Sequence, residues 1–126
     1  MTRAVVLDAG ALIALDRKDR AMLAVVSVIV RDKIPTYVPA GVVAQVWRGD
    51  ARQDGIATLL TSDAIRIAPL DGQAAHRIGI LLGRTGNSDV TDAHVALLAA
   101  KTGGVVYTSD PTDIAAIDPS LAIETV

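Results

Sequence analysis

The sequence contains no cysteine and no phenylalanine, and aromatic residues make up only 2% of its 126 residues. Without cysteine, the chain forms no disulfide bond, thiolate metal site or cysteine nucleophile. Hydrophobic residues still make up 51% of the chain, so we expect a core of closely packed aliphatic side chains. The length suits one domain that spans residues 1–126.

Positive charge and long apolar runs are also scarce. Lys and Arg number 12 against 14 Asp and Glu, which argues against a broadly basic nucleic-acid-coating protein but leaves room for a local basic groove. The apolar run at residues 21–30 is about half a bilayer span, so we expect a buried core helix and no membrane contact. The apolar run before Asp8 is too short for a signal peptide, which favours a cytoplasmic location.

The chain alternates regularly between strand patterns and helix patterns. Strand patterns cover residues 4–7, 35–39, 64–70, 105–110 and 121–126. Helix patterns cover residues 10–18, 19–33, 40–47, 51–61, 71–86, 88–104 and 111–117, and the third and fourth of these suggest a helical hairpin. The alternation predicts an α/β fold, a three-layer α/β/α sandwich around a mainly parallel sheet.

Four aspartates stand where such a fold places functional groups. Asp8 and Asp110 each directly follow a strand pattern, and the carboxyl ends of parallel strands share one edge of a sheet. Asp89 and Asp92 are three residues apart, on one face of a first helical turn. Each aspartate alone is explained by helix capping or by the helix dipole. Capping does not explain why Asp8 and Asp110 share one pattern, so we also expect a common site.

Converging carboxylates need a counterion. Two carboxylates about 4 Å apart repel each other by roughly 4 kcal/mol at an effective dielectric of about 20. With no cysteine and two histidines, the available ligands are hard oxygens, which favour Mg²⁺ or Mn²⁺ over Zn²⁺. Such a metal can polarise a phosphate and activate a bound water, which suits phosphodiester cleavage.

Three segments in order, "VVLDAGALIAL", "SDVTDAHVALLAA" and "VVYTSDPTDI", resemble PIN-domain proteins, particularly the VapC-type toxins of bacterial toxin–antitoxin pairs. The resemblance runs nearly end to end. It implies a Mg²⁺-dependent endoribonuclease that attacks RNA with metal-activated water and forms no covalent protein intermediate. It assigns Asp8, Asp92 and Asp110 as catalytic acids and metal ligands, with Asp89 as an accessory ligand. It also implies a small cognate antitoxin and a homodimer.

The sequence departs from that family at two positions. Gln45 stands where many members have a glutamate; its carbonyl oxygen can still hold a metal-bound water, or Asp50 can contribute instead. Gly10 lacks the hydroxyl that often follows the first acid, so that contact would fall to backbone or water. Thr108 and Ser109 can orient Asp110 or touch a phosphate, or act only as local hydrogen-bonding residues.

Other polar and aromatic residues carry weaker signals. His94 points off the face of Asp92, so neither it nor the structural His76 is expected to bind metal. Trp47 can stack on a base, although packing is the commoner role. The candidates for contacts with RNA phosphates, each of them otherwise an ordinary solvated charge, are Arg48, Arg52 and Arg84.

Alternative functions remain open from the sequence. One is a PIN-fold module that binds RNA or a partner and whose activity is weakened by Gln45. Another is a receiver-like phosphoacceptor domain, which needs adjacent acids where "LDAGA" offers one. A haloacid-dehalogenase-like phosphatase needs an aspartate at the position of Gly10. Metal-dependent melting and RNA cleavage separate the nuclease from the binding module.

Overall fold

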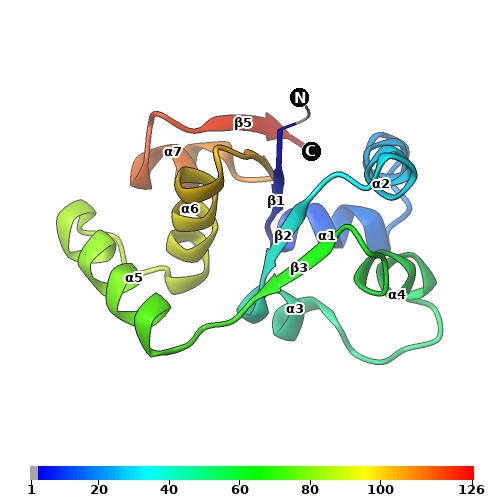
Figure 1. The fold of residues 1–126 in the computed structure, drawn as a ribbon, viewed down its shortest axis with the longest axis horizontal. Helices are drawn as coiled ribbons and strands as arrows, with labels where there is room; N and C mark the ends of the chain where they lie inside the picture. Colours follow the sequence, from blue (N-terminus) through cyan, green and yellow to red (C-terminus); the bar gives the residue numbers. More distant parts are fainter. Residues whose placement is uncertain (1–2) are drawn as a thin grey trace.

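A five-stranded, fully parallel sheet forms the centre of the computed structural model, which describes residues 3–126 (Figure 1). Its strand order is β3-β2-β1-β4-β5, and each neighbouring pair is parallel. The strands are β1 (Val5–Leu7), β2 (Thr36–Pro39), β3 (Ile65–Ala68), β4 (Val105–Thr108) and β5 (Ala122–Thr125). The prediction of a mainly parallel sheet is therefore confirmed.

Helices cover both faces of the sheet, which confirms the three-layer α/β/α sandwich (Figure 1). One side carries α1 (Ala9–Asp16), α2 (Arg20–Asp32), α3 (Ala40–Val46) and α4 (Asp54–Leu60). The other side carries α5 (Gly72–Thr85), α6 (Val90–Thr102) and α7 (Pro111–Ile117). On that side α6 packs on β1, β2 and β4, and α5 packs on α6 and α7.

The core is aliphatic, as the composition predicts. Val6, Leu7 and Leu12 are fully buried, and Met22 is the one sulfur-containing side chain among the buried residues of 3–126. Residues of β1 contribute to clusters on both faces: Leu7 packs with α1 and α4, and Val6 packs with α6. Burial on both faces explains why the pattern at residues 4–7 is continuously apolar rather than alternating.

The expectation that residues 21–30 form a buried core helix was only partly right. Helix α2 buries a single stripe that contains Met22, Val26 and Ile29. The residues on its outer side remain substantially exposed, namely Leu23, Val28 and Val30. Within residues 3–126, every helix is too short or too polar to span a bilayer.

The helical hairpin predicted at residues 40–61 was wrong. Helices α3 and α4 each pack on α1, and a longer segment joins them (Figure 1). Buried Gln53 fixes that segment: its side-chain amide donates to the carbonyl of Val46 (2.9 Å), and its Oε1 accepts from the backbone N–H of Arg48 (2.9 Å). This polar side chain therefore pairs with backbone groups at the end of α3 and directly after it.

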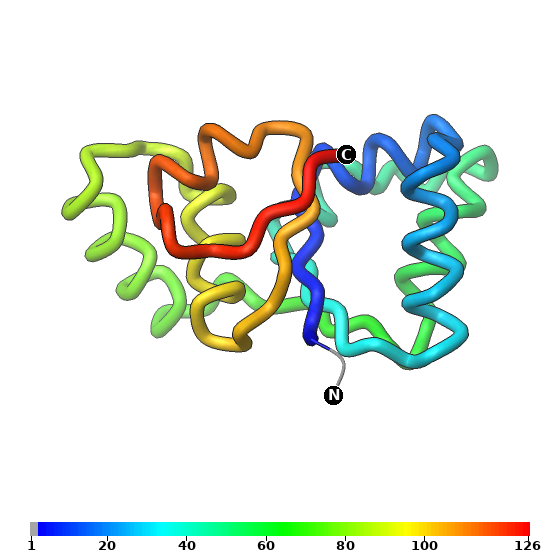
Figure 2. Tube along the Cα trace, turned by 90° about the horizontal axis from the view of Figure 1, so that it is seen from above, coloured from blue at the N-terminus to red at the C-terminus, as the bar shows by residue number. Residues whose placement is uncertain are grey.

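The starts of α1, α6 and α7 meet at the carboxyl edge of the sheet. Helix α1 follows β1 directly, and α7 follows β4. Helix α6 runs back across the sheet into β4, so its first turn lies at the same edge. The chain end after β5 also comes to this edge, beside α1 (Figure 2).

Candidate functional site

Asp8 lies at the end of β1 and is almost completely buried. Its Oδ1 accepts a hydrogen bond from the backbone N–H of Ala11 (2.9 Å), so it is the N-cap of α1. Burial raises the pKa of Asp8 in spite of this bond and of a hydrogen bond with Thr108, and the charge of Asp110 raises it further. The capping role suggested by the sequence is real, but it does not explain the burial of the carboxyl group.

Thr108 joins the ends of β1 and β4. It is fully buried, its side chain hydrogen-bonds the Asp8 carboxylate, and its Oγ1 accepts from the backbone N–H of Asp110 (2.9 Å). One hydroxyl therefore orients two strand-end acids. The sequence suggested an effect on Asp110, whereas the contact with the Asp8 carboxylate appears only in the structure.

Asp92 lies in the first turn of α6, at the carboxyl edge of the sheet, and burial and the charges of the neighbouring carboxylates raise its pKa. Its pKa is raised to about 6, first by burial and then by the charges of Asp89, Asp8, Asp113 and Asp110. All of the charged groups that act on it are carboxylates. The four predicted acids and Asp113 therefore form one electrostatically coupled cluster, which we call the acid edge.

Asp89 and Asp110 occupy the exposed rim of the acid edge. Asp89 is the N-cap of α6, and its Oδ1 accepts from the backbone N–H of Asp92 (2.9 Å). Asp110 precedes Pro111 at the start of α7, and its side chain makes no capping hydrogen bond. Asp8 and Asp89 therefore use an oxygen for capping, whereas the carboxylate of Asp110 is not used in this way.

Asp113 is the member of the acid edge that sequence reasoning missed. It lies in the first turn of α7, three residues after Asp110, and its charge raises the pKa of Asp92. The signal was present, because "DPTD" repeats the spacing of Asp89 and Asp92 in "DVTD".

The donor set suits a hydrated hard cation. Within residues 3–126, no three Asp, Glu or His side chains lie close enough together to hold a metal ion as a closed ligand cage. Mg²⁺ commonly binds through one or two carboxylates and keeps several waters, so it does not need such a cage. The concentrated negative charge around Asp92 fits a divalent cation of this kind.

Gly10 has a steric reason to lack a side chain. A Cβ at this position would lie 2.8 Å from Cβ of Ser109 and 3.0 Å from its backbone nitrogen, and closer still to its hydroxyl oxygen. Gly10 belongs to the first turn of α1 and is not among the glycines with positive φ, so its backbone needs no glycine. The Ser109 hydroxyl thus stands where the side chain of a larger residue 10 would begin.

Gln45 is exposed on α3. It lies one helical turn after Gly41, where an added Cβ would be 3.7 Å from Oγ1 of Thr91 in the first turn of α6. Gln45 therefore lies on the face of α3 that is turned toward α6. Asp50, considered as a substitute for the missing glutamate, instead forms an exposed ion pair with Arg52 at 2.9 Å, which lowers its pKa to about 2.

The other candidates from the sequence lie outside the acid edge. Nη1 of Arg48 donates to the carbonyls of Ala44 and Trp47 at the end of α3, and Trp47 itself is 36% exposed. His94 is buried, burial lowers its pKa, and it lines a pocket that contains none of the acid-edge residues. His76 is exposed on α5 and is not a core residue.

Comparisons with known proteins find the same fold in several solved structures. No protein-family model and no curated protein sequence matches the chain. Solved structures do match, among them a chain of DNA-bound VapBC from Salmonella typhimurium, with a TM-score of 0.68, 18% identity and 98% of both chains covered. A chain of the Rickettsia felis VapBC2 complex with promoter DNA matches at a TM-score of 0.67 and 14% identity, over 97% of this chain and 98% of that one.

A third match is a chain of FitAcB from Neisseria gonorrhoeae, with a TM-score of 0.61 and 18% identity over 94% of this chain and 95% of that one. These identities are low, so the likeness establishes the fold. The near-complete coverage of both chains in each pair also shows that the shared fold extends over almost the whole sequence.

Proposed function

We propose that the chain is a metal-dependent endoribonuclease, with Mg²⁺ or Mn²⁺ as cofactor, and the toxin of a toxin–antitoxin pair. The observation that carries the proposal is Asp92, whose pKa is raised to about 6 amid four other carboxylates. The likeness to chains of VapBC and FitAcB complexes supports the link to toxin–antitoxin systems. An acid edge of this kind serves a nuclease better than it serves a module that binds polyanionic RNA by charge alone.

In this proposal the metal is held by the acid edge: one or two of Asp8, Asp92 and Asp110 would bind it directly, and the others, with Asp89, would act through its bound waters. When bound, the metal supplies an activated water and neutralises charge on the phosphate. The protein fixes the position and charge environment of these carboxylates. Thr108 orients Asp8, and partial burial of Asp92 strengthens its interactions with nearby charges.

The second candidate function is a PIN-fold module that binds RNA or a partner without cleaving. The observation that favours it is Gln45, a neutral amide on the face of α3 turned toward α6. A neutral amide gives weaker cation binding than a carboxylate would give there. The receiver-like alternative is disfavoured by topology, since receivers have the strand order 2-1-3-4-5 and this sheet has 3-2-1-4-5.

The proposed antitoxin contact is supported by an apolar groove between α2 and α4. The groove has a volume of about 400 Å³, and its apolar lining includes Leu23 and Val30, both substantially exposed. An exposed apolar groove of this kind is a common docking surface for a partner segment. The proposed homodimer would be checked by the molar mass of the purified chain in solution.

The deciding experiment incubates the purified chain with a mixed pool of single-stranded RNA in Mg²⁺, in Mn²⁺ and in EDTA. We expect cleavage with either metal, none in EDTA, and none for Asp110→Asn. We also expect both metals to raise the Tm of the wild-type chain, since they bind the folded state. RNA binding without cleavage in any of these conditions would favour the second candidate instead.

A further inference from the structure

A groove lies along the outer side of α1, and two of its lining residues, Gly10 and Ser109, are close in the chain to Asp8 and Asp110. It has a volume of about 540 Å³ and is the largest of the described cavities. A third lining residue, Arg17, lies at the end of α1. The other lining residues are Ile13, Ala14, Asp19 and Val126.

We propose that this groove binds the RNA strand beside the scissile phosphate, with the Ser109 hydroxyl and the Arg17 guanidinium as its phosphate contacts. The inference rests on the proposed ribonuclease function and names the path that the substrate takes. Neither Arg17 nor this side of α1 is marked by a motif in the sequence.

The steric relation between Gly10 and Ser109 supports the inner contact. Because Gly10 carries no side chain, the Ser109 hydroxyl stands against the first turn of α1 at the mouth of the groove. Ser109 is exposed, and it is the neighbour of Asp110 in the chain. A hydroxyl at this place can donate to a phosphate oxygen next to the one that meets the acid edge.

Arg17 provides the outer contact. Within residues 3–126, the ion pairs are Arg31 with Asp32 and Arg52 with Asp50, so Arg17 is not neutralised by either. Gly10 and Arg17 are separated by about 10 Å along α1, at about 1.5 Å per residue, so Ser109 and Arg17 would contact different phosphates. The carboxylate of Asp19 is turned toward its own helix, where it accepts from the backbone N–H of Met22 at 3.0 Å.

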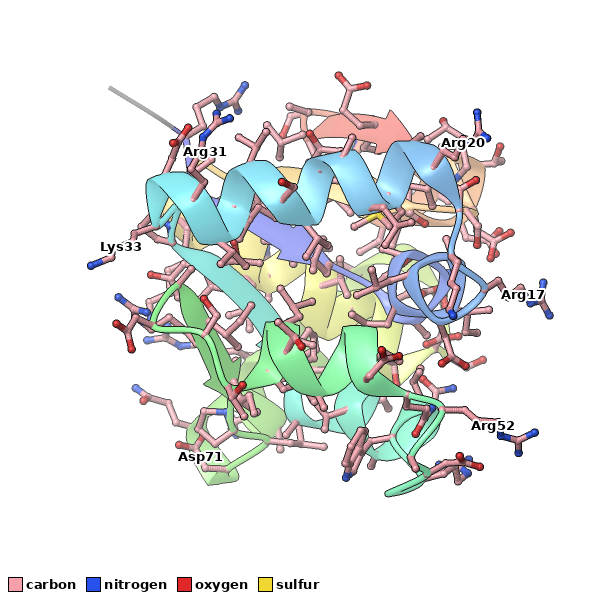
Figure 3. All side chains as sticks on the ribbon, turned by 90° about the vertical axis from the view of Figure 1, so that its right-hand side faces the viewer. Arg17, Arg20, Arg31, Lys33, Arg52 and Asp71 are labelled. Carbon is pink, nitrogen blue, oxygen red and sulfur yellow. The ribbon has the colours of Figure 1, made fainter. Side chains whose placement is uncertain are left out.

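Basic side chains also gather on this side of the molecule. Arg17 and Arg20 lie on the side toward which the β5 arrow points, whereas Arg31 and Lys33 lie on the opposite side (Figure 3). An acidic catalytic edge repels RNA unless nearby cations offset it, and Arg17 lies in a groove that adjoins this edge.

The test measures two quantities in Mg²⁺: cleavage of a fluorescently labelled single-stranded RNA, and binding of the same RNA to the Asp92→Asn background by anisotropy. Arg17→Ala should weaken binding about tenfold and reduce the slope of log affinity against log salt by about 0.7. Ser109→Ala should weaken binding about threefold to tenfold, the effect of one hydrogen bond. Arg31→Ala, on the opposite side, is the charge-matched control and should bind like its parent.

Exchanging the residue types at positions 10 and 109 independently tests the steric relation between Gly10 and Ser109. Gly10→Ser should lower both Tm and RNA affinity, whereas Gly83→Ser, where a Cβ meets nothing within 4 Å, should not. Combining Gly10→Ser with Ser109→Gly should restore the Tm and return part of the affinity, because the hydroxyl then enters the groove from α1.

The results separate the two proposals. If the wild-type chain cleaves RNA but Arg17→Ala and Ser109→Ala bind and cleave like their parents, the groove assignment is overturned and the ribonuclease stands. If the wild-type chain neither binds nor cleaves RNA in Mg²⁺, the ribonuclease fails before any variant is compared, and the groove assignment falls with it.

Discussion

The acid edge and the segment between α3 and α4 give the same side chain opposite environments. Asp50 in that segment pairs with Arg52 at 2.9 Å, and its pKa falls to about 2. Asp92 at the acid edge is partly buried beside four other carboxylates, and its pKa rises to about 6. Local sequence produces the first environment, since Asp50 and Arg52 are two residues apart; only the assembled sheet edge produces the second.

The difference shows where the protein leaves charge uncompensated. An exposed ion pair contributes little to stability and is common on protein surfaces. Several coupled carboxylates oppose folding, and such perturbed groups concentrate at functional sites. This contrast between Asp50 and Asp92 can be tested at four levels.

The largest expected effect is on catalysis. Asp92→Asn should reduce metal-dependent RNA cleavage by about 100-fold or more, because the neutral amide holds a divalent cation more weakly than the carboxylate does. The matched control is Asp50→Asn, which makes the same chemical change outside the acid edge and should leave the cleavage rate unchanged. Initial rates on labelled RNA measure both, and an Asp92→Asn protein with full activity would contradict the assignment.

The next effect concerns Thr108. Thr108→Val should lower cleavage by about 10- to 100-fold, since it removes a hydrogen bond to the Asp8 carboxylate and the acceptor for the N–H of Asp110. Leaving that backbone group without a partner should also cost about 1–3 kcal/mol of stability. Thr108→Ser keeps the hydroxyl and should retain most activity. Equal cleavage by the Val and Ser variants would show that the hydroxyl does not orient the acids.

A smaller effect is expected at Gln45. Gln45→Glu adds a carboxylate on the face of α3 turned toward α6 and should tighten Mg²⁺ binding severalfold. Gln73→Glu adds the same charge on α5, beside His94 and Lys101, and serves as the control. Titration calorimetry, or Tm against Mg²⁺ concentration, measures the change. If the two variants bind Mg²⁺ equally, Gln45 lies outside the site.

The smallest effect is on stability as a function of pH without metal. The pKa of Asp92 is raised on folding, so its favourable contribution is present below about pH 4 and is lost as the pH rises through about 6. The lowered pKa of Asp50 has the opposite sign: its contribution is present above about pH 4 and is lost as the pH falls toward 2.

Tm measured in EDTA across this range tests both signs. Relative to Asp92→Asn, the wild-type chain should lose stability as the pH rises from about 4 to 7, and added Mg²⁺ should reduce that loss. Relative to Asp50→Asn, it should lose stability as the pH falls below about 4. A wild-type curve parallel to that of Asp92→Asn would show that Asp92 is not electrostatically strained.

Much of the fold could be predicted from the sequence because its patterns are local. The continuous apolar run of β1, the caps Asp19 and Asp71, and Gly103 at the end of α6 all lie where the sequence indicates. Each of these signals depends on neighbouring residues, which are close in space whatever the rest of the chain does. The prediction of a helical hairpin failed because the packing of α3 and α4 on α1 is not a local feature.

The candidate site was half predictable. The residue types at the ends of two strands and at the start of one helix indicate which acids can meet, because parallel strands end at one edge. The spacing of the missed residue, Asp113, from Asp110 is visible in the sequence, but its effect on Asp92 comes from a different helix and requires the packed structure. The exposure of the outer side of α2 could likewise not be predicted from its apolar composition.

Residue types and their spacing therefore set the α/β fold and the composition of the acid edge in advance. Tertiary structure alone decided how strongly the acids interact, that one buried Thr108 hydroxyl serves both Asp8 and Asp110, and that Gly10 leaves room for Ser109. The physical reason is the distance along the chain over which each effect acts. Capping and hydrophobic periodicity act within a few residues, whereas burial and charge coupling depend on every element packed around a group.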